Sequence, residues 1–137
     1  FYDDQAAIRQ GRTQDGVAYL GQPVTPGFGA VRIPAAAVSV GLKLSSGGVA
    51  WGDMVSVQYS GAAGRDPLFD PGAISALVQT VVAPRLKDRP ADESLANAEA
   101  AFAFHRDARL PVAVEYGVSQ ALLRAEALVR GETVAET

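Results

Sequence analysis

The hydrophobic pattern of this 137-residue chain changes its period once, and that change orders its expected structural elements. From Val38 to about Gln58, apolar side chains alternate with polar or small ones, which is typical of strands. After Asp70 they recur every three or four positions, as in helices. The stretch from Val55 to Leu68 is therefore the strand-to-helix crossing, and loops at such crossings often carry binding residues.

Two strands are predicted before the crossing. The first covers Val38 to Leu44, and the second runs from Val49 to about Gln58 after a tight turn. Gly52 and Asp53 interrupt the second alternation, which predicts a bulge or twist. Because two strands alone are marginally stable, a third strand is expected, and residues preceding Phe1 could supply it. The apolar members expected on the second strand are Val49, Trp51, Met54, Val55 and Val57.

Three helices are predicted after the crossing. Asp70 and Pro71 suit a helix start, and Pro84 should end or kink that helix. A second helix covers 91–104, and a third opens at Leu110 and stops at Gly131. The expected apolar stripes are Ile74, Leu77, Val78, Val81 and Val82 in the first helix, Leu95, Ala98 and Phe102 in the second, and Val114, Val118, Ala121, Leu122, Ala125, Leu128 and Val129 in the third.

Residues 1–30 show neither period. A segment of this length without regular structure is usually a functional loop or a tail, and its spaced aromatic residues favour a loop that docks on another surface. A short helical turn is predicted over Asp4 to Gln10, with Asp3 or Asp4 as its cap and Gly11 as its end.

Composition excludes several classes of function. The net charge is -3 and the 12 Lys and Arg residues are scattered, which argues against a nucleic-acid partner. The chain has no cysteine, so it forms neither disulfides nor thiolate metal sites, which fits a reducing cytoplasm. No apolar run approaches the about 20 residues needed to cross a bilayer, so no membrane partner is expected.

The crossing holds the best candidate for a small-molecule site. Gln58 offers an amide donor and acceptor, or simply satisfies backbone groups at a strand end. Gly61 and Gly64 free the backbone to approach an anion, or form a plain connecting loop that lacks the ending of a nucleotide P-loop. Arg65 adds a cation that could equally pair with Asp66. Nothing here supplies a nucleophile or a strong base.

The other polar candidates define no reaction. His105 is the single histidine, and without a second histidine or a carboxylate pattern it reads as a helix-end residue rather than a catalyst. Asp3 and Asp4 are adjacent and more often cap a helix than share a metal. The aromatic residues Trp51, Phe102 and Phe104 are interpreted as core or interface side chains.

The chain resembles the N-terminal domain of 3-methylaspartate ammonia-lyases, which are members of the enolase superfamily. The resemblance covers nearly the whole chain, and its most specific part is the motif from Val57 to Phe69. Further matching segments are Tyr2 to Ile8, Gln14 to Gly16, Pro23 to Phe28, and Tyr116 to Leu122.

The resemblance implies an α+β fold like that of the enolase N-terminal domain, in which a small antiparallel β-meander precedes a three-helix bundle. Residues 1–137 would form a capping domain, with the first strand and a C-terminal (β/α)8 barrel outside this chain. In that family the barrel holds Mg²⁺ and supplies the lysine and histidine for eliminating ammonia from 3-methylaspartate to give mesaconate. No catalytic residue and no metal ligand are therefore expected in these residues.

The resemblance also assigns roles to particular residues. Gln58 matches the capping-domain glutamine that reaches the substrate, and Tyr59 would help to position it. The segment from Tyr2 to Phe28 would lie over the barrel mouth and exclude water. Met54 stands where the family often has a small residue or cysteine. A cytoplasmic homodimer with a small amino-acid substrate is expected.

Two other functions remain open at this point. The same cap could serve another enolase-superfamily enzyme, such as a racemase or a cycloisomerase. Alternatively, the glycine loop could make this a non-enzymatic anion-binding domain.

Overall fold

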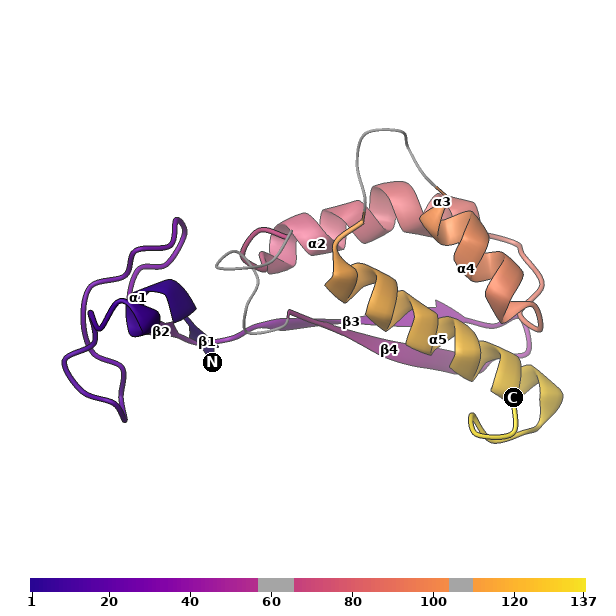
Figure 1. Cartoon of the computed structure of the whole chain (residues 1–137). Coiled ribbons are helices and arrows are strands. Elements are labelled where there is room, and N and C mark those ends of the chain that lie inside the picture. The colour runs from indigo at the N-terminus through magenta and orange to yellow at the C-terminus, as the bar shows by residue number, and fades with distance from the viewer. Residues whose placement is uncertain (57–65, 104–109) are drawn as a thin grey trace. The chain divides into compact units, whose positions relative to one another are not determined.

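A computed structural model describes residues 1–56, 66–103 and 110–137 of the chain (Figure 1). They form two compact units, which are described separately below. The N-terminal unit comprises Phe1–Ala36 and Ser56–Asp70, and the sheet–helix unit comprises Ala37–Val55 and Pro71–Thr137.

The N-terminal unit is built on a short antiparallel pair of strands. β1 (Tyr2–Asp3) pairs with β2 (Arg32–Ile33), so that Asp3 lies directly opposite Arg32. The sequence did not predict these strands, because two residues are too few to show a period of two. They tie the two ends of the first 33 residues together.

The helical turn predicted near the N-terminus is confirmed. α1 (Gln5–Arg9) starts after Asp4, whose carboxylate accepts hydrogen bonds from the N–H groups of Ala6 and Ala7. Gly11 follows the helix with φ +66°, which glycine adopts without steric cost. Asp4, rather than Asp3, is therefore the cap.

Residues 13–21 form a closed loop, called loop 13–21 below. An isolated antiparallel bridge joins Thr13 to Gly21, and the Gln14 N–H donates to the Leu20 carbonyl oxygen at 2.5 Å. The side chains that fill the interior of the N-terminal unit are Tyr2, Asp4, Ala7, Thr25, Phe28, Val31 and Phe69. The segment that showed no periodicity therefore has a core of its own.

The sheet–helix unit begins with the predicted hairpin. β3 (Ala37–Lys43) and β4 (Val49–Val55) pair in an unbroken antiparallel register from Ala37↔Val55 to Lys43↔Val49. The bulge expected at Gly52 is wrong, because Gly52 pairs directly with Val40. The predicted turn between the strands is confirmed, with Gly47 at φ +98°.

Of the apolar residues expected on β4 that the structure describes, only Met54 is buried. Ala50, Gly52 and Met54 are buried, whereas Val49, Trp51 and Val55 are between 40% and 52% exposed. The reason is the close approach of the last helix, whose backbone lies against Gly52 and leaves room on that face only for small side chains and for Met54. Trp51 lies instead over Gly41 on the opposite face of the hairpin.

The first predicted helix is present but has three parts. α2 (Pro71–Leu77) continues through a π-helical turn, η1 (Val78–Val82), into α3 (Ala83–Leu86). Pro84 does not end the helix. A proline ring clashes with the carbonyl group four residues earlier, and the wider π turn, in which the Ala83 N–H donates to Val78, gives that ring space.

The other two predicted helices are present as α4 (Ser94–Phe102) and α5 (Val112–Arg130). The stripe expected on α4 is partly wrong, because Leu95 is 81% exposed whereas Asn97 and Ala101 are buried. The stripe on α5 is confirmed from Val114 to Ala125, and Gly131 ends the helix at φ +69°. Leu128 and Val129, near its C-terminal end, are half exposed.

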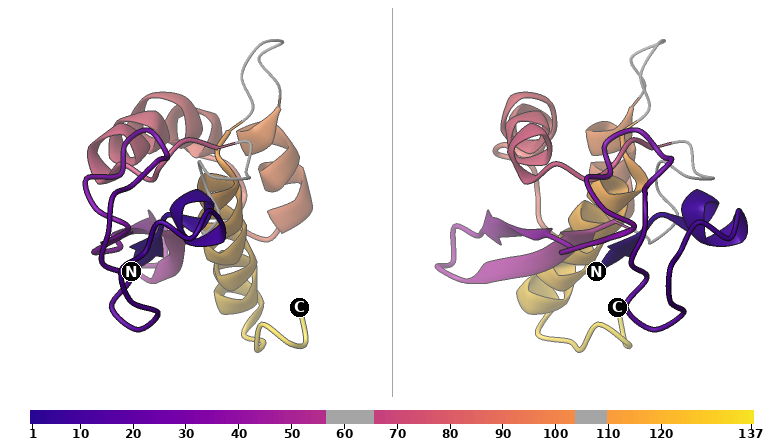
Figure 2. Two further views of the ribbon diagram at one scale, coloured as in Figure 1. Left: turned by 60° about the vertical axis from the view of Figure 1, so that its left-hand side comes forward. Right: turned by 90° about the vertical axis from the view of Figure 1, so that its left-hand side faces the viewer.

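Within the sheet–helix unit, α5 lies alongside the β3–β4 hairpin (Figure 2). α4 packs against α5, and α2 contacts β3. Helices following small antiparallel sheets confirm the predicted α+β class. The third strand of the expected meander is not among the described residues. No helix in the described parts of the chain is both long and apolar enough to cross a membrane.

Candidate functional site

Gln58 and Tyr59 lie outside the described residues, as do Gly61, Gly64, Arg65 and His105. Their roles therefore stay predictions. Among the described residues, the candidate site consists of two hydrogen-bond networks in the N-terminal unit.

Asp4 is the centre of the first network. Its side chain is fully buried and accepts five hydrogen bonds. Besides the two from α1, the Val24 N–H donates at 2.7 Å, the Thr25 N–H at 2.9 Å and the Thr25 hydroxyl at 2.6 Å. A carboxylate buried this completely needs such partners, because an unpaired buried charge is very costly. Asp4 thus joins the start of α1 to residues 24 and 25.

These bonds control the ionisation of Asp4. Burial by itself would raise the pKa of Asp4, but the hydrogen bonds from Thr25, Val24 and Ala7 favour the charged form and hold the pKa below its ordinary value. Asp4 is therefore a structural anion, and it carries no proton to give to a substrate at neutral pH.

Arg32 is the centre of the second network. Its guanidinium group makes a bidentate ion pair with Asp3, with Nε–Oδ1 at 2.7 Å and Nη2–Oδ2 at 2.8 Å. The same group lies 4.4 Å from the centroid of the Tyr19 ring and 5.6 Å from that of Phe1. Hydrogen bonding to Arg32 holds the pKa of Asp3 below its ordinary value, and the same pairing raises the pKa of Arg32.

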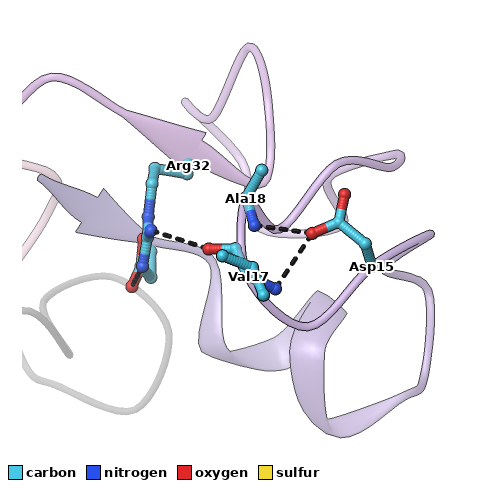
Figure 3. A network of polar contacts seen from close by, with 5 residues as sticks. Asp15, Val17, Ala18 and Arg32 are labelled. Atoms are coloured by element: carbon cyan, nitrogen blue, oxygen red, sulfur yellow. Dashed lines mark hydrogen bonds and ion pairs between the residues drawn. The ribbon is translucent and has the colours of Figure 1, made fainter.

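Arg32 also holds loop 13–21. Its Nη1 donates to the Val17 carbonyl oxygen at 3.2 Å, while Oδ1 of Asp15 accepts from the Val17 N–H at 2.9 Å and the Ala18 N–H at 2.5 Å (Figure 3). The hydrogen bonds from Ala18 and Val17 also lower the pKa of Asp15. Both backbone polar groups of Val17 are thus paired within the N-terminal unit.

The two large aliphatic side chains of this loop face solvent. Val17 is 86% exposed and Leu20 is 56% exposed. Large apolar side chains fixed in this way are suited to contact with another surface, and they offer no group for proton transfer or nucleophilic attack.

A third contact involves Leu68, the last residue of the strand-to-helix crossing. A Cβ atom on Gly27, which has φ +92°, would lie 3.6 Å from Cδ2 of Leu68. Phe28 and Phe69, their chain neighbours, are both buried. Residues 68 and 69 are therefore packed within the unit that Asp4 organises.

The described residues offer no place for a metal ion, since they contain no group of three or more His, Cys, Asp or Glu side chains able to hold one. The sheet–helix unit has a groove of about 1040 Å³ that runs from the end of β3 to α3 and α5. Two of its polar side chains are already engaged, because Arg89 donates to Asn97 and Asn97 donates to the Pro90 carbonyl oxygen.

Sequence reasoning did not single out Arg32, Tyr19 or Asp15. Arg32 contacts residues that precede it by between 13 and 31 positions in the sequence. No local sequence pattern indicates contacts over such separations. Asp15 did leave a signal, since an aspartate followed by glycine is typical of a turn whose carboxylate caps the next N–H groups.

The family model described as "Methylaspartate ammonia-lyase N-terminus" matches residues 1–137. Methylaspartate ammonia-lyase of Haloarcula marismortui is 47% identical over 97% of this chain and 32% of the relative, and that of Citrobacter amalonaticus is 46% identical over 99% and 33%. The chain thus spans about a third of the length of these relatives.

Two solved structures resemble the chain closely. β-Methylaspartase from Clostridium tetanomorphum, solved as a Mg complex, has a TM-score of 0.88 at 42% identity and covers 98% of this chain and 33% of that one. The Citrobacter amalonaticus enzyme, solved with (2S,3S)-3-methylaspartic acid, has a TM-score of 0.87 at 46% identity with the same coverage.

Proposed function

Because the chain belongs to the methylaspartate ammonia-lyase family, we propose that it is the capping domain of an enzyme that eliminates ammonia from 3-methylaspartate to give mesaconate. The observation that carries the proposal is the match of the family model to all 137 residues. The proposal concerns the full-length protein. The relatives are about three times as long as this chain.

The proposal divides the work between two parts of that protein. The part beyond residues 1–137, a (β/α)8 barrel, holds Mg²⁺. The metal ion would stabilise the negative charge that develops when the proton at C3 of 3-methylaspartate is removed. This chain contributes Gln58 and Tyr59 to the substrate site.

The N-terminal unit supports a covering role. Asp4 bonds to residues 24 and 25, and Arg32 bonds to the Val17 carbonyl oxygen, so parts of the segment 13–28 are anchored within this unit. A preorganised cover excludes water from the intermediate at little entropic cost on closing. The proposal places this unit over the barrel mouth, and it retains the cytoplasmic homodimer as a prediction.

The experiment is an assay of the full-length protein with 3-methylaspartate and Mg²⁺, in which mesaconate and ammonia are both measured. We expect the two products in equal amounts, and we expect EDTA to abolish them. An isomerised product instead would assign the protein to another reaction, and no turnover of 3-methylaspartate would overturn the proposal.

A further inference from the structure

The β3–β4 hairpin exposes the side that points away from α5. The buried residues of β4, among them Gly52, face α5, and successive side chains of a strand point to opposite sides. The other residues of both strands therefore share one surface, and all of them are exposed. This surface is called the outer face below, and it consists of Ala37, Ser39, Gly41, Lys43, Val49, Trp51, Asp53 and Val55.

Trp51 lies at the centre of the outer face. It pairs with Gly41, and a Cβ atom on Gly41 would lie 2.9 Å from Cζ3 of the indole ring and 3.1 Å from Cε3. Glycine at position 41 therefore lets the ring lie against β3, while Trp51 still exposes 52% of its surface. A ring supported in this way loses little entropy when a partner covers it, and tryptophan is enriched among the residues that dominate interface energies.

Val49 and Val55 extend the apolar surface along β4. They are 40% and 46% exposed and lie on the same side of the strand as Trp51. Single exposed apolar residues are common, but a row of three on a sheet is typical of a contact surface. The strands are about 23 Å long at about 3.3 Å per residue. Because a stable interface buries about 800 Å² on each partner, the outer face would be the centre of such an interface rather than the whole of it.

The outer face carries a cation and an anion on opposite sides of Trp51. Lys43 is the last residue of β3, and Asp53 pairs with Ser39, four residues earlier in that strand. Lys43 and Asp53 are therefore separated by about 13 Å along the strands, which is too far for an ion pair within one hairpin. Asp53 is held by the Ser39 hydroxyl, which donates to its Oδ1 at 2.6 Å.

This charge pattern is complementary to itself. Sheets stack face to face about 10 Å apart, and a two-fold axis between two copies brings the same face against itself. If the axis runs across the strands, the second hairpin is reversed, and Lys43 of each copy lies over the end of the other that carries Asp53. If the axis ran along the strands, Lys43 would face Lys43, and like charges opposed in this way are unfavourable.

We propose that the outer face is the centre of a homodimer interface, in which the hairpins of two copies pack face to face about a two-fold axis that runs across the strands at Trp51. The inference rests on the proposed function, which retains the homodimer as a prediction, and it assigns the contact to particular residues. The two indole rings would meet at the axis, and an ion pair between Lys43 and Asp53 would form on each side of it.

The exchange of subunits in the full-length protein tests the role of Trp51. Unlabelled and isotope-labelled samples are mixed, and the mixed dimer is followed by native mass spectrometry, because interface substitutions act mainly on the dissociation rate. We expect Trp51→Ala to exchange at least about tenfold faster than the natural sequence. Leu95→Ala is the matched control, since Leu95 is 81% exposed on α4, and we expect it to leave the rate unchanged. An unchanged rate in Trp51→Ala, or a natural protein that is monomeric, would overturn the proposal.

Exchange of the two charges tests the arrangement of the copies. We expect Lys43→Asp and Asp53→Lys each to accelerate subunit exchange, and we expect the double variant to return within about threefold of the natural rate. Such a recovery requires contact between copies, because the two positions are too far apart within one hairpin. Lys87→Asp, an exposed lysine outside the outer face, controls for the change in net charge. A double variant that exchanges as fast as the single variants would overturn the two-fold arrangement.

The outcomes separate this inference from the proposed function and from other occupants of the outer face. Mesaconate formation by a protein whose exchange rate Trp51→Ala does not change would keep the function and overturn the interface, as expected if the barrel covers this face. A dimer that depends on Trp51 and on the paired charges, in a protein without turnover, would keep the interface and overturn the function. Hydrogen exchange of peptides from β4 verifies that each variant is folded.

Discussion

Gly52 of β4 and Gly117 of α5 lie so close together that neither could carry a side chain without displacing backbone. A Cβ atom on Gly52 would overlap the Gly117 carbonyl oxygen, and one on Gly117 would lie 2.5 Å from Cγ of Met54 and 2.9 Å from the carbonyl carbon of Asp53. This contact brings the helix and the hairpin to backbone distance, and it decides which face of β4 is buried.

Gly117→Ala is therefore expected to destabilise the sheet–helix unit by about 2 kcal/mol, although alanine is intrinsically the better helix residue by about 1 kcal/mol. Hydrogen exchange of peptides from β4 and α5 in the full-length protein measures this change. The control is Gly48→Ala in the same unit, where a Cβ atom would make only ordinary contact with Leu44, at 3.8 Å. Equal exchange in both variants would contradict the account of the contact.

Asp4→Asn is expected to loosen the N-terminal unit. Both carboxylate oxygens accept hydrogen bonds, so in either orientation the amide NH₂ group would face N–H donors that it cannot satisfy. The expected cost is about 3 kcal/mol, and it would appear as faster hydrogen exchange over residues 4–9 and 22–28.

Asp15→Asn is the matched control for this substitution. Oδ1 of Asp15 accepts the bonds from both Val17 and Ala18, so an asparagine oxygen can replace it. We expect the change to cost less than about 1 kcal/mol. A larger effect at residue 15 than at residue 4 would contradict this assignment.

The pKa of Asp4 predicts how the N-terminal unit responds to acid. Because the folded-state pKa lies below the ordinary value of 3.8, the stabilisation is fully present above pH 3.8 and is lost as the pH falls through the lower folded-state value. Asp3, whose pKa Arg32 also lowers, acts in the same direction.

Hydrogen exchange over residues 22–28, corrected for the intrinsic effect of pH, follows this loss. We expect a steep decrease of protection below pH 3.8 in the natural sequence and a shallower one in Asp4→Asn, where Asp3 and Asp15 still titrate but position 4 does not. Parallel pH profiles in the two proteins would mean that Asp4 does not control the transition.

The period of the hydrophobic pattern predicted the hairpin and α5, because both are regular over several repeats. It did not indicate which face of β4 is buried, because the close approach of Gly117 leaves room on the buried face only for small side chains and for Met54. Pro84 shows a similar limit: the sequence indicated a disturbance, but not that a π turn would absorb it.

The candidate site was less predictable than the fold. Asp4 as a helix cap follows from local rules, but its bonds to Val24 and Thr25 span about 20 residues. The pairing of Asp3 with Arg32 depends on two strands of two residues, which have no pattern to detect. Gln58 and Tyr59 came from the family resemblance, and as they are not among the described residues, their roles stay predictions.

The most direct test of the central claim is the turnover of 3-methylaspartate by the full-length protein with Gln58→Ala, measured beside the natural sequence at saturating Mg²⁺. A lost hydrogen bond to a charged substrate corresponds to a decrease in kcat/KM of about 10- to 100-fold, and we expect a loss in that range without a change in the hydrogen exchange of the sheet–helix unit. An unchanged kcat/KM would show that this chain does not reach the substrate through Gln58, and it would contradict the account.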